Sequence, residues 1–380
     1  MIYFDNAATT LPKPDAVIEA VRQSMLHSGN ANRGTHEGTL GASQIIFDTR
    51  RKLAAAFGLD RPDHVVFTSN ATESLNIALN GLFQPGDHVI STDLEHNSVL
   101  RPLYRLEKEK LISLSFIGAN PDGTLRYEEL EEQLRPETRC LVCSHASNVT
   151  GNLSDLQRLG SFAHEHGLIF LVDAAQTGGS IPISMRAIPI DILCLTGHKG
   201  LLGPQGTGAL LINGDCYIRP FKTGGTGVQS ALHEQPDELP TRLEAGTLNS
   251  HGIAGLSAAL DFISERGMET IHQYEKELML RFIQPLREIP GLRLYGNFEG
   301  DRTAVVSLNI GSVDSSMVSD VLFQDYQIAT RPGAHCAPRM HRALGTSGQG
   351  TVRFSFSLFN TEEEVDFAVK ALKEIAEDRL

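Results

Sequence analysis

Two apolar segments separated by a short polar stretch constrain the fold of this chain more than any other part of its sequence. They are LIFLVD at residues 168–173 and IDILCLT at residues 190–196. Apolar runs of this length, bounded by Gly and Pro, are typical of strands buried on both faces of a parallel sheet. The first run ends at Asp173, and the second leads through Thr196 into Lys199. Because ligands of such sheets bind beyond the carboxyl ends of the strands, we expect a ligand site here.

The acid and the lysine at these two strand ends indicate a particular chemistry. A carboxylate can keep a pyridine nitrogen protonated, so that the ring accepts electrons, and a lysine amine can condense with an aldehyde. Taken singly, Asp173 could be a helix cap and Lys199 a solvated surface residue. As a pair followed by the Gly-rich segment 200–208, they predict a site for pyridoxal 5'-phosphate (PLP).

Several segments along the chain resemble motifs of a known protein family. They are FDNAATT (residues 4–10), EHNS (95–98), RLEAGT (242–247), RPGAHCAP (331–338) and RFSFSLFNT (353–361). Together with the segment around Lys199, they resemble the class V aminotransferases, and within them the cysteine desulfurase and selenocysteine lyase group. The resemblance implies PLP fold type I, an α/β architecture. Its large domain, with a mostly parallel sheet, would span residues 15–265, and residues 266–380 with 1–14 would form a small α+β domain.

A binding site for the PLP phosphate is predicted where a strand runs into a helix. HVVFTS at residues 64–69 reads as the strand, and Asn70, Ala71 and Thr72 open the helix. The first turn of a helix presents free N–H groups that bind anions. Asn70 could simply cap the helix, but both roles are compatible. We therefore expect Ala71 and Thr72 to bind the phosphate.

Other side chains are expected around the cofactor ring. Gln176 can donate to the phenolic oxygen, and the amide of Asn148 could hold either that oxygen or the substrate carboxylate. The resemblance implies that His96 stacks on the ring and exchanges protons.

The resemblance also assigns further phosphate ligands. It implies that Thr196 and His198 bind the phosphate, and that Thr247 reaches the phosphate of a neighbouring subunit. The protein would then be a homodimer with shared active sites.

Four residues are candidates for substrate binding in addition to Asn148. Asn6 could lie near the substrate or could merely form a turn, and His36 matches a family segment at the mouth of the site. Arg331 lies five residues before a cysteine, Cys336. Arg353 matches the arginine that grips the substrate carboxylate, a task that suits a planar bidentate donor.

Only one of the five cysteines suggests catalysis. An odd and sparse set does not suggest disulfides, and the C-x-x-C of Cys140 and Cys143 lies in an apolar run without a second metal-binding pair. Cys336 follows His335 in a loop with Arg331, and cationic neighbours favour a reactive thiolate. Without context an inert loop cysteine would be the commoner case, but the resemblance implies a catalytic thiol.

Length and charge set the broad class. A chain of 380 residues can hold two domains. Its formal net charge of −13 disfavours nucleic acid as a partner. No apolar run approaches the roughly 20 residues of a membrane span, and no signal-peptide pattern is evident at the N-terminus. We expect a cytoplasmic enzyme without a membrane partner.

The predicted reaction is the conversion of L-cysteine to L-alanine, with the sulfur captured on Cys336 as a persulfide. Lys199 would move the Cα proton, His96 would shuttle protons, and no metal is expected. The alternative is a selenocysteine lyase or another C–S lyase, in which Cys336 is less essential. The intact set of Lys199, Asp173 and Cys336 argues against a non-catalytic PLP-binding scaffold. A sulfur-acceptor protein is an expected partner, but the loop at 223–242, shorter than in well-studied members, leaves its identity open.

Helical periodicity predicts the remaining elements. We expect helices over residues 12–28 and 43–57, over 252–287 with an interruption near Gly267, and over 317–325. A final helix should begin at the capping-box pattern of Thr361 and Glu364.

Overall fold

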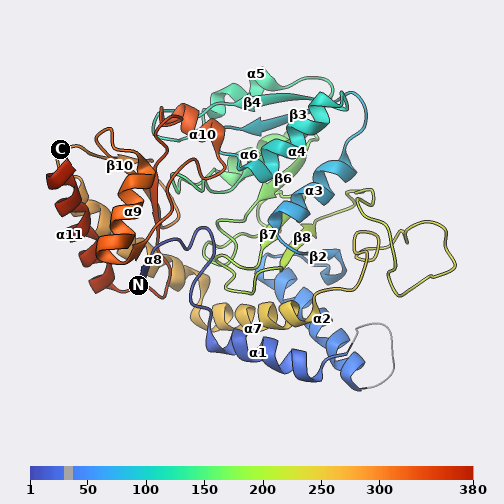
Figure 1. Cartoon of the computed structure of the whole chain (residues 1–380). Helices are drawn as coiled ribbons and strands as arrows, with labels where there is room; N and C mark the ends of the chain where they lie inside the picture. The colour runs from blue at the N-terminus through green and yellow to red at the C-terminus, as the bar shows by residue number, and fades with distance from the viewer. Residues whose placement is uncertain (30–36, 380) are drawn as a thin grey trace.

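The computed structural model describes residues 1–29 and 37–379, and its central element is a seven-stranded sheet (Figure 1). The strands are β2 (Val65–Thr68), β3 (Asp87–Thr92), β4 (Ile112–Ile117), β5 (Thr138–Ser144), β6 (Ile169–Asp173), β7 (Ile192–Thr196) and β8 (Gly208–Ile212), in the order β2-β8-β7-β6-β5-β3-β4. The pairs from β7 through β6, β5 and β3 to β4 are parallel, whereas β8 runs antiparallel to both β7 and β2. The two strands predicted at 168–173 and 190–196 are confirmed, and every residue of β7 is buried.

The continuous apolar runs are explained by two separate cores, one on each face of this sheet. Side chains alternate between the faces of a strand, so Val142 and Cys194 belong to one core while Cys143 and Leu193 belong to the other. The helices α3 (Ala71–Leu82) and α4 (Asn97–Lys108) contribute to the first core. The helices α1 (Asp15–His27), α2 (Glu37–Ala56), α6 (Leu156–Glu165) and α7 (Ser250–Arg266) contribute to the second.

A smaller unit with its own core lies beside the large sheet. An antiparallel sheet in the order β12-β10-β9 combines β9 (Leu292–Tyr295), β10 (Val305–Ile310) and β12 (Val352–Ser355). The helices here are α8 (Met268–Leu286), α9 (Ser315–Tyr326) and α11 (Glu362–Arg379). The short helix α10 (Pro338–Ala343) instead buries Met340 in a core of the large sheet. The first strand, β1 (Ile2–Tyr3), pairs in parallel with β11 (Ile328–Ala329), so the N-terminus joins this unit.

The predicted helices agree with the structure apart from some of their bounds. The helix expected at 43–57 extends further toward the N-terminus, because α2 begins at Glu37. The predicted interruption at Gly267 separates α7 from α8. This glycine has φ +83°, a backbone angle that is unfavourable for residues with a side chain. Short helical turns complete the fold: α5 (Leu130–Gln133) and the 3₁₀ turns Pro62–His64 and Tyr127–Glu129. None of the described helices combines the length and apolar character needed to cross a membrane.

Candidate active site

A cavity of about 240 Å³ opens at the carboxyl ends of the central parallel strands. Ser144 of β5 pairs with Asp173 of β6, which in turn pairs with Cys194 of β7, so these strands end at the same edge of the sheet. The cavity brings together residues from five separate segments. Its lining is Asn70, Ala71, Thr72, His96, Ser98, Ser144, Ala146, Asn148, Asp173, Ala175, Gln176, Thr196, His198 and Lys199.

Asp173 and Lys199 both line this cavity, as their strand-end positions predicted. Asp173 is buried, its Oδ1 accepts a hydrogen bond from the Ala175 N–H at 2.9 Å, and burial raises its pKa. Enclosure by protein lowers the pKa of Lys199 to about 8, although the charge of Asp173 acts in the opposite direction. The amine is therefore neutral in a substantial fraction of molecules near pH 8, and a neutral amine is a nucleophile and a base.

The predicted phosphate ligands of this chain, other than Thr247, all line the cavity. Asn70 caps α3, because its side chain accepts from the Glu73 N–H at 2.9 Å, and the next residues, Ala71 and Thr72, line the cavity. The Thr196 hydroxyl and His198 Nδ1 are buried and have no partner within residues 1–29 and 37–379. Burial lowers the pKa of His198 to about 4, so its ring is neutral near pH 7.

His96 caps α4 and is held in one tautomer. Its Nδ1 accepts from the Ser98 N–H at 3.1 Å, so the neutral ring carries its proton on Nε2. Burial, and then the charge of Lys199, lower its pKa to about 4. His96 is therefore a neutral imidazole with a donor on Nε2.

The donor set of this cavity fits PLP. Buried polar atoms without partners are rare in folded proteins, and here the Thr196 hydroxyl, His198 Nδ1 and Asn148 Oδ1 all belong to residues that line one cavity. The free end of a helix beside two of them suits a phosphate. A buried carboxylate and an amine at the other strand ends suit the ring nitrogen and the aldehyde.

The loop that carries Cys336 is anchored to the wall of the cavity. The Cys336 carbonyl accepts from the Asn97 N–H at 2.7 Å, one residue after His96, and the His335 carbonyl accepts from Asn148 Nδ2 at 2.6 Å. His335 and Cys336 both have positive φ, +48° and +57°, an unusual conformation for non-glycine residues.

One expectation about this loop is wrong. His335 was expected to act as a cationic neighbour of the thiol, but its side chain is buried and its Nε2 lies 3.1 Å from the Thr351 carbonyl. Burial, and then the charge of Arg353, lower its pKa to about 2. His335 is therefore neutral and cannot stabilise a thiolate by charge. Arg331, half-buried, remains as the positive group of this loop.

The other residues predicted to bind substrate do not all lie at the cavity. Arg353 is buried at the end of the small sheet, and the field of its charge reaches Lys199. Asn6 is buried, and its Nδ2 donates to the Ser355 carbonyl at 2.9 Å, which favours the structural alternative for this residue. Thr247 is exposed and lies outside the cavity of its own chain. His36 falls outside the described residues.

Sequence reasoning missed a buried carboxyl group behind the cavity. Glu95 is fully buried and accepts from the Thr92 hydroxyl at 2.7 Å and from the Ser144 N–H at 2.9 Å. Burial raises its pKa to about 7. Its place beside His96 at a strand end was a signal, but its partner Ser144 is 49 residues away and no local pattern marks the contact.

Comparisons with known proteins agree with the geometry of this site. The Aminotransferase class-V family profile matches residues 2–367. A probable cysteine desulfurase of Pyrococcus abyssi is 36% identical over 386 residues, covering 99% of this chain and 94% of that protein. A cysteine desulfurase of Escherichia coli O157:H7 is 33% identical, with 99% and 93% covered.

Solved structures give the same result. The apo structure of a cysteine desulfurase from Thermococcus onnurineus NA1 matches with a TM-score of 0.93 at 33% identity, covering 99% of this chain and 95% of that one. The cysteine desulfurase CsdA (S-sulfonic acid) from Escherichia coli matches with a TM-score of 0.90 at 30% identity, covering 100% and 95%.

Proposed function

The chain belongs to the class V aminotransferase family, and from this premise we propose that it is a PLP-dependent cysteine desulfurase. The reaction would convert L-cysteine to L-alanine and leave the sulfur on Cys336. The single observation that carries the proposal is the anchoring of the Cys336 loop on the wall of the cavity that contains Lys199 and Asp173. The backbone of the loop that carries Cys336 is thereby fixed beside a site whose polar groups fit PLP.

We propose that this chain holds PLP through residues at each of its polar groups and at the face of its ring. Ala71, Thr72, Thr196 and His198 would bind the phosphate, Asp173 the ring nitrogen, Lys199 the aldehyde carbon, and Gln176 with Asn148 the phenolic oxygen. His96 would stack on the ring. When bound, PLP supplies an electron sink that weakens the bonds at the α-carbon of an amino acid.

Proton transfer at the substrate would fall to Lys199 and His96. The neutral fraction of the Lys199 amine can accept the Cα proton and return it, which its pKa of about 8 permits near neutral pH. His96 can donate from Nε2, because Ser98 fixes its tautomer. Arg353 would bind the substrate carboxylate.

The thiol step is a nucleophilic displacement. The Cys336 sulfur, as a thiolate, attacks the sulfur of the substrate, and the S–S bond forms as the C–S bond breaks. The electron pair of the C–S bond stays with carbon, which takes up one proton to become the methyl group of L-alanine. The balance is L-cysteine plus one enzyme thiol to L-alanine plus one enzyme persulfide, with no external oxidant.

Product analysis of the purified holoenzyme tests this function. L-cysteine should yield L-alanine together with one extra sulfur on the peptide that contains Cys336. Cys336→Ser should still bind PLP and L-cysteine but form almost no alanine. Cys216→Ser is the matched control, because Cys216 is half-buried like Cys336 but lines a different cavity, together with Arg139 and Asp191. Alanine formation at the wild-type rate by Cys336→Ser would end the proposal, and turnover of selenocysteine alone would favour a selenocysteine lyase.

We also propose that the protein is a homodimer. Five large apolar residues on α1 and α2 are exposed to solvent, with exposed fractions of 53% to 67%. They are Ile18, Met25, Leu26, Leu40 and Phe47. Exposed apolar groups gathered on neighbouring elements are typical of an interface between subunits. The exposed position of Thr247 is compatible with its reaching a second subunit.

A further inference from the structure

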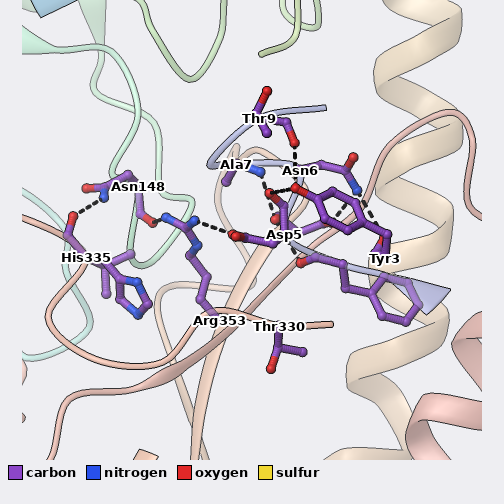
Figure 2. Close-up of polar contacts among 12 residues, drawn as sticks. Tyr3, Asp5, Asn6, Ala7, Thr9, Asn148, Thr330, His335 and Arg353 are labelled. Carbon is purple, nitrogen blue, oxygen red and sulfur yellow. Dashed lines mark hydrogen bonds and ion pairs between the residues drawn. The ribbon is translucent and has the colours of Figure 1, made fainter. Parts of the chain in front are cut away.

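Arg353 has an unusual environment for a buried guanidinium, and Figure 2 shows how its partners lie. The side chain is 1% exposed. Its Nη2 donates to Asp5 Oδ1 at 2.9 Å, and its Nη1 donates to the Asn148 carbonyl at 3.0 Å from the other side (Figure 2). Its Nε is buried without a partner in the described part of the chain. Both terminal nitrogens of the guanidinium are therefore tied to protein, while Nε makes no hydrogen bond to the described residues.

The backbone around Asp5 is fixed independently of this ion pair. The Ala7 N–H donates to the Ser355 hydroxyl at 2.9 Å, and the Tyr3 hydroxyl donates to the Thr9 carbonyl at 2.9 Å. Burial, and then the charge of Asp5, raise the pKa of Tyr3 to about 12, so the hydroxyl keeps the proton that it donates. The carboxylate of Asp5 is consequently presented to Arg353 by a constrained segment.

A second buried arginine shows what a purely structural guanidinium looks like in this fold. Arg302 donates to the carbonyls of Asn297, Thr150 and Val305, and it stacks on a phenylalanine ring. None of its described partners is a carboxylate, and Arg302 is not among the main charges that shift the pKa of Lys199. Arg353 differs on both counts, since it pairs with Asp5 and its field reaches the Lys199 amine.

The charges of Asp5 and Arg353 both influence the Lys199 amine, next to which the substrate must bind. Their charges shift the pKa of Lys199 in opposite directions, Arg353 downward and Asp5 upward. An amino acid whose α-carbon lies at the Lys199 amine therefore has its carboxylate within the field of Arg353. The bond to Asn148 also links Arg353 to the Cys336 loop, because Asn148 Nδ2 donates to the His335 carbonyl.

We propose that Asp5 is a positioning residue for recognition of the amino-acid substrate. Its carboxylate holds the guanidinium of Arg353 in the orientation that binds the substrate carboxylate. This rests on the proposed function, in which Arg353 binds the substrate carboxylate. An arginine side chain that is already immobilised loses little further conformational entropy when it binds an anion. Asp5 itself makes no contact with the substrate carboxylate, which carries the same charge, and its effect on binding of that carboxylate is exerted through Arg353.

Ligand binding to the PLP-loaded enzyme tests this role without any turnover. Calorimetry would compare L-alanine with ethylamine, which has the same amine but no carboxylate. Asp5→Ala should weaken L-alanine binding roughly 10-fold, the size expected for loss of a charge-assisted hydrogen bond, and should leave ethylamine binding unchanged. Asp5→Asn should recover most of the L-alanine affinity, because its amide oxygen can still accept from Nη2.

Two further variants separate positioning from a general loosening of the N-terminal segment. Tyr3→Phe removes a hydrogen bond of the same segment but retains the Asp5 carboxylate, so it should affect both ligands equally or neither. In an Arg353→Met background, Asp5→Ala should cause no additional loss of L-alanine affinity, since the residue through which Asp5 acts is absent.

The outcomes that overturn the proposal differ from those that overturn the desulfurase assignment. Unchanged L-alanine binding in Asp5→Ala, or an equal loss for L-alanine and ethylamine, would refute the positioning role. Asp5→Asn as defective as Asp5→Ala would also refute it. A protein that forms no alanine from cysteine but shows the predicted discrimination would refute the desulfurase function and retain the role of Asp5.

Discussion

At the residue scale, burial shifts the pKa values of Asp173 and Lys199, the acid and the amine of the proposed cofactor site, in opposite directions. It raises the pKa of Asp173 and lowers that of Lys199, and their mutual attraction opposes both shifts. The net result for Lys199 is a pKa of about 8. Because the charged form of an amine cannot attack an aldehyde, this shift governs how readily the apoprotein acquires PLP.

PLP loading should therefore depend on pH through Lys199. Lys199 is protonated below its pKa, so the rate of PLP incorporation into apoprotein should rise with pH and level off above about 8. Asp173→Asn removes the charge that raises the pKa of Lys199, and should move the midpoint to lower pH. Stopped-flow absorbance during loading measures both, and borohydride reduction followed by mass spectrometry should place the cofactor on Lys199. A midpoint near 10.4, the value of an ordinary lysine, would contradict the shift.

At the scale of elements, helix termini provide much of the site. Asn70 caps α3 beside the residues proposed to bind the phosphate, and His96 caps α4 beside the Cys336 loop. His96 therefore has two roles in one position, since Nδ1 accepts the Ser98 N–H while Nε2 is available to the cavity. The first role stabilises the helix and the second is the proposed proton transfer.

Substitutions at His96 should separate these two roles. His96→Asn keeps a side-chain acceptor for the cap, whereas His96→Ala removes it and should cost a further ~1 kcal/mol of unfolding free energy. Both variants should lose roughly 10²- to 10⁴-fold in turnover, the usual span for a general acid–base group. Chemical denaturation and steady-state kinetics provide the two measurements. A variant that turns over like the wild type would reduce His96 to a packing and capping residue.

At the scale of the whole molecule, the N-terminal segment joins the two units around the site. Strand β1 pairs with β11 of the small unit, and the Thr10 N–H then donates to the His198 carbonyl at the edge of the large sheet. Gln176 of the cavity donates to the Ala7 carbonyl at 3.1 Å. The site is thus closed by a segment that begins in the other unit.

Mixing two inactive chains should test the shared site. If Thr247 completes the phosphate site of a neighbouring subunit, one site of a Lys199→Ala and Thr247→Ala heterodimer is intact and the other carries both changes. Random co-assembly should then restore about a quarter of all sites. Co-expression followed by activity and PLP content per chain measures the recovery, with each homodimer as the control. Full activity of a protein that sediments as a monomer would refute the shared site.

Local sequence patterns determined the elements and the strand ends. The runs at 168–173 and 190–196 are apolar throughout because both faces of β6 and β7 are covered, and polar residues can follow only where the strands leave the core. The capping box predicted from the sequence is confirmed. The Glu364 N–H donates to the Thr361 hydroxyl at 3.3 Å, and the Thr361 N–H donates to the Glu364 carboxylate. Such signals involve neighbours along the chain, so the sequence alone contains them.

Only the tertiary structure decided which distant residues meet and in which charge state. Asp5 and Arg353 are 348 positions apart, and the Asn97 N–H reaches the Cys336 carbonyl across the fold. No periodicity encodes such pairs, because their proximity depends on how two separate cores pack. The same holds for His335, which looked like a cation in the sequence and is neutral because burial removes the water that would solvate its charge.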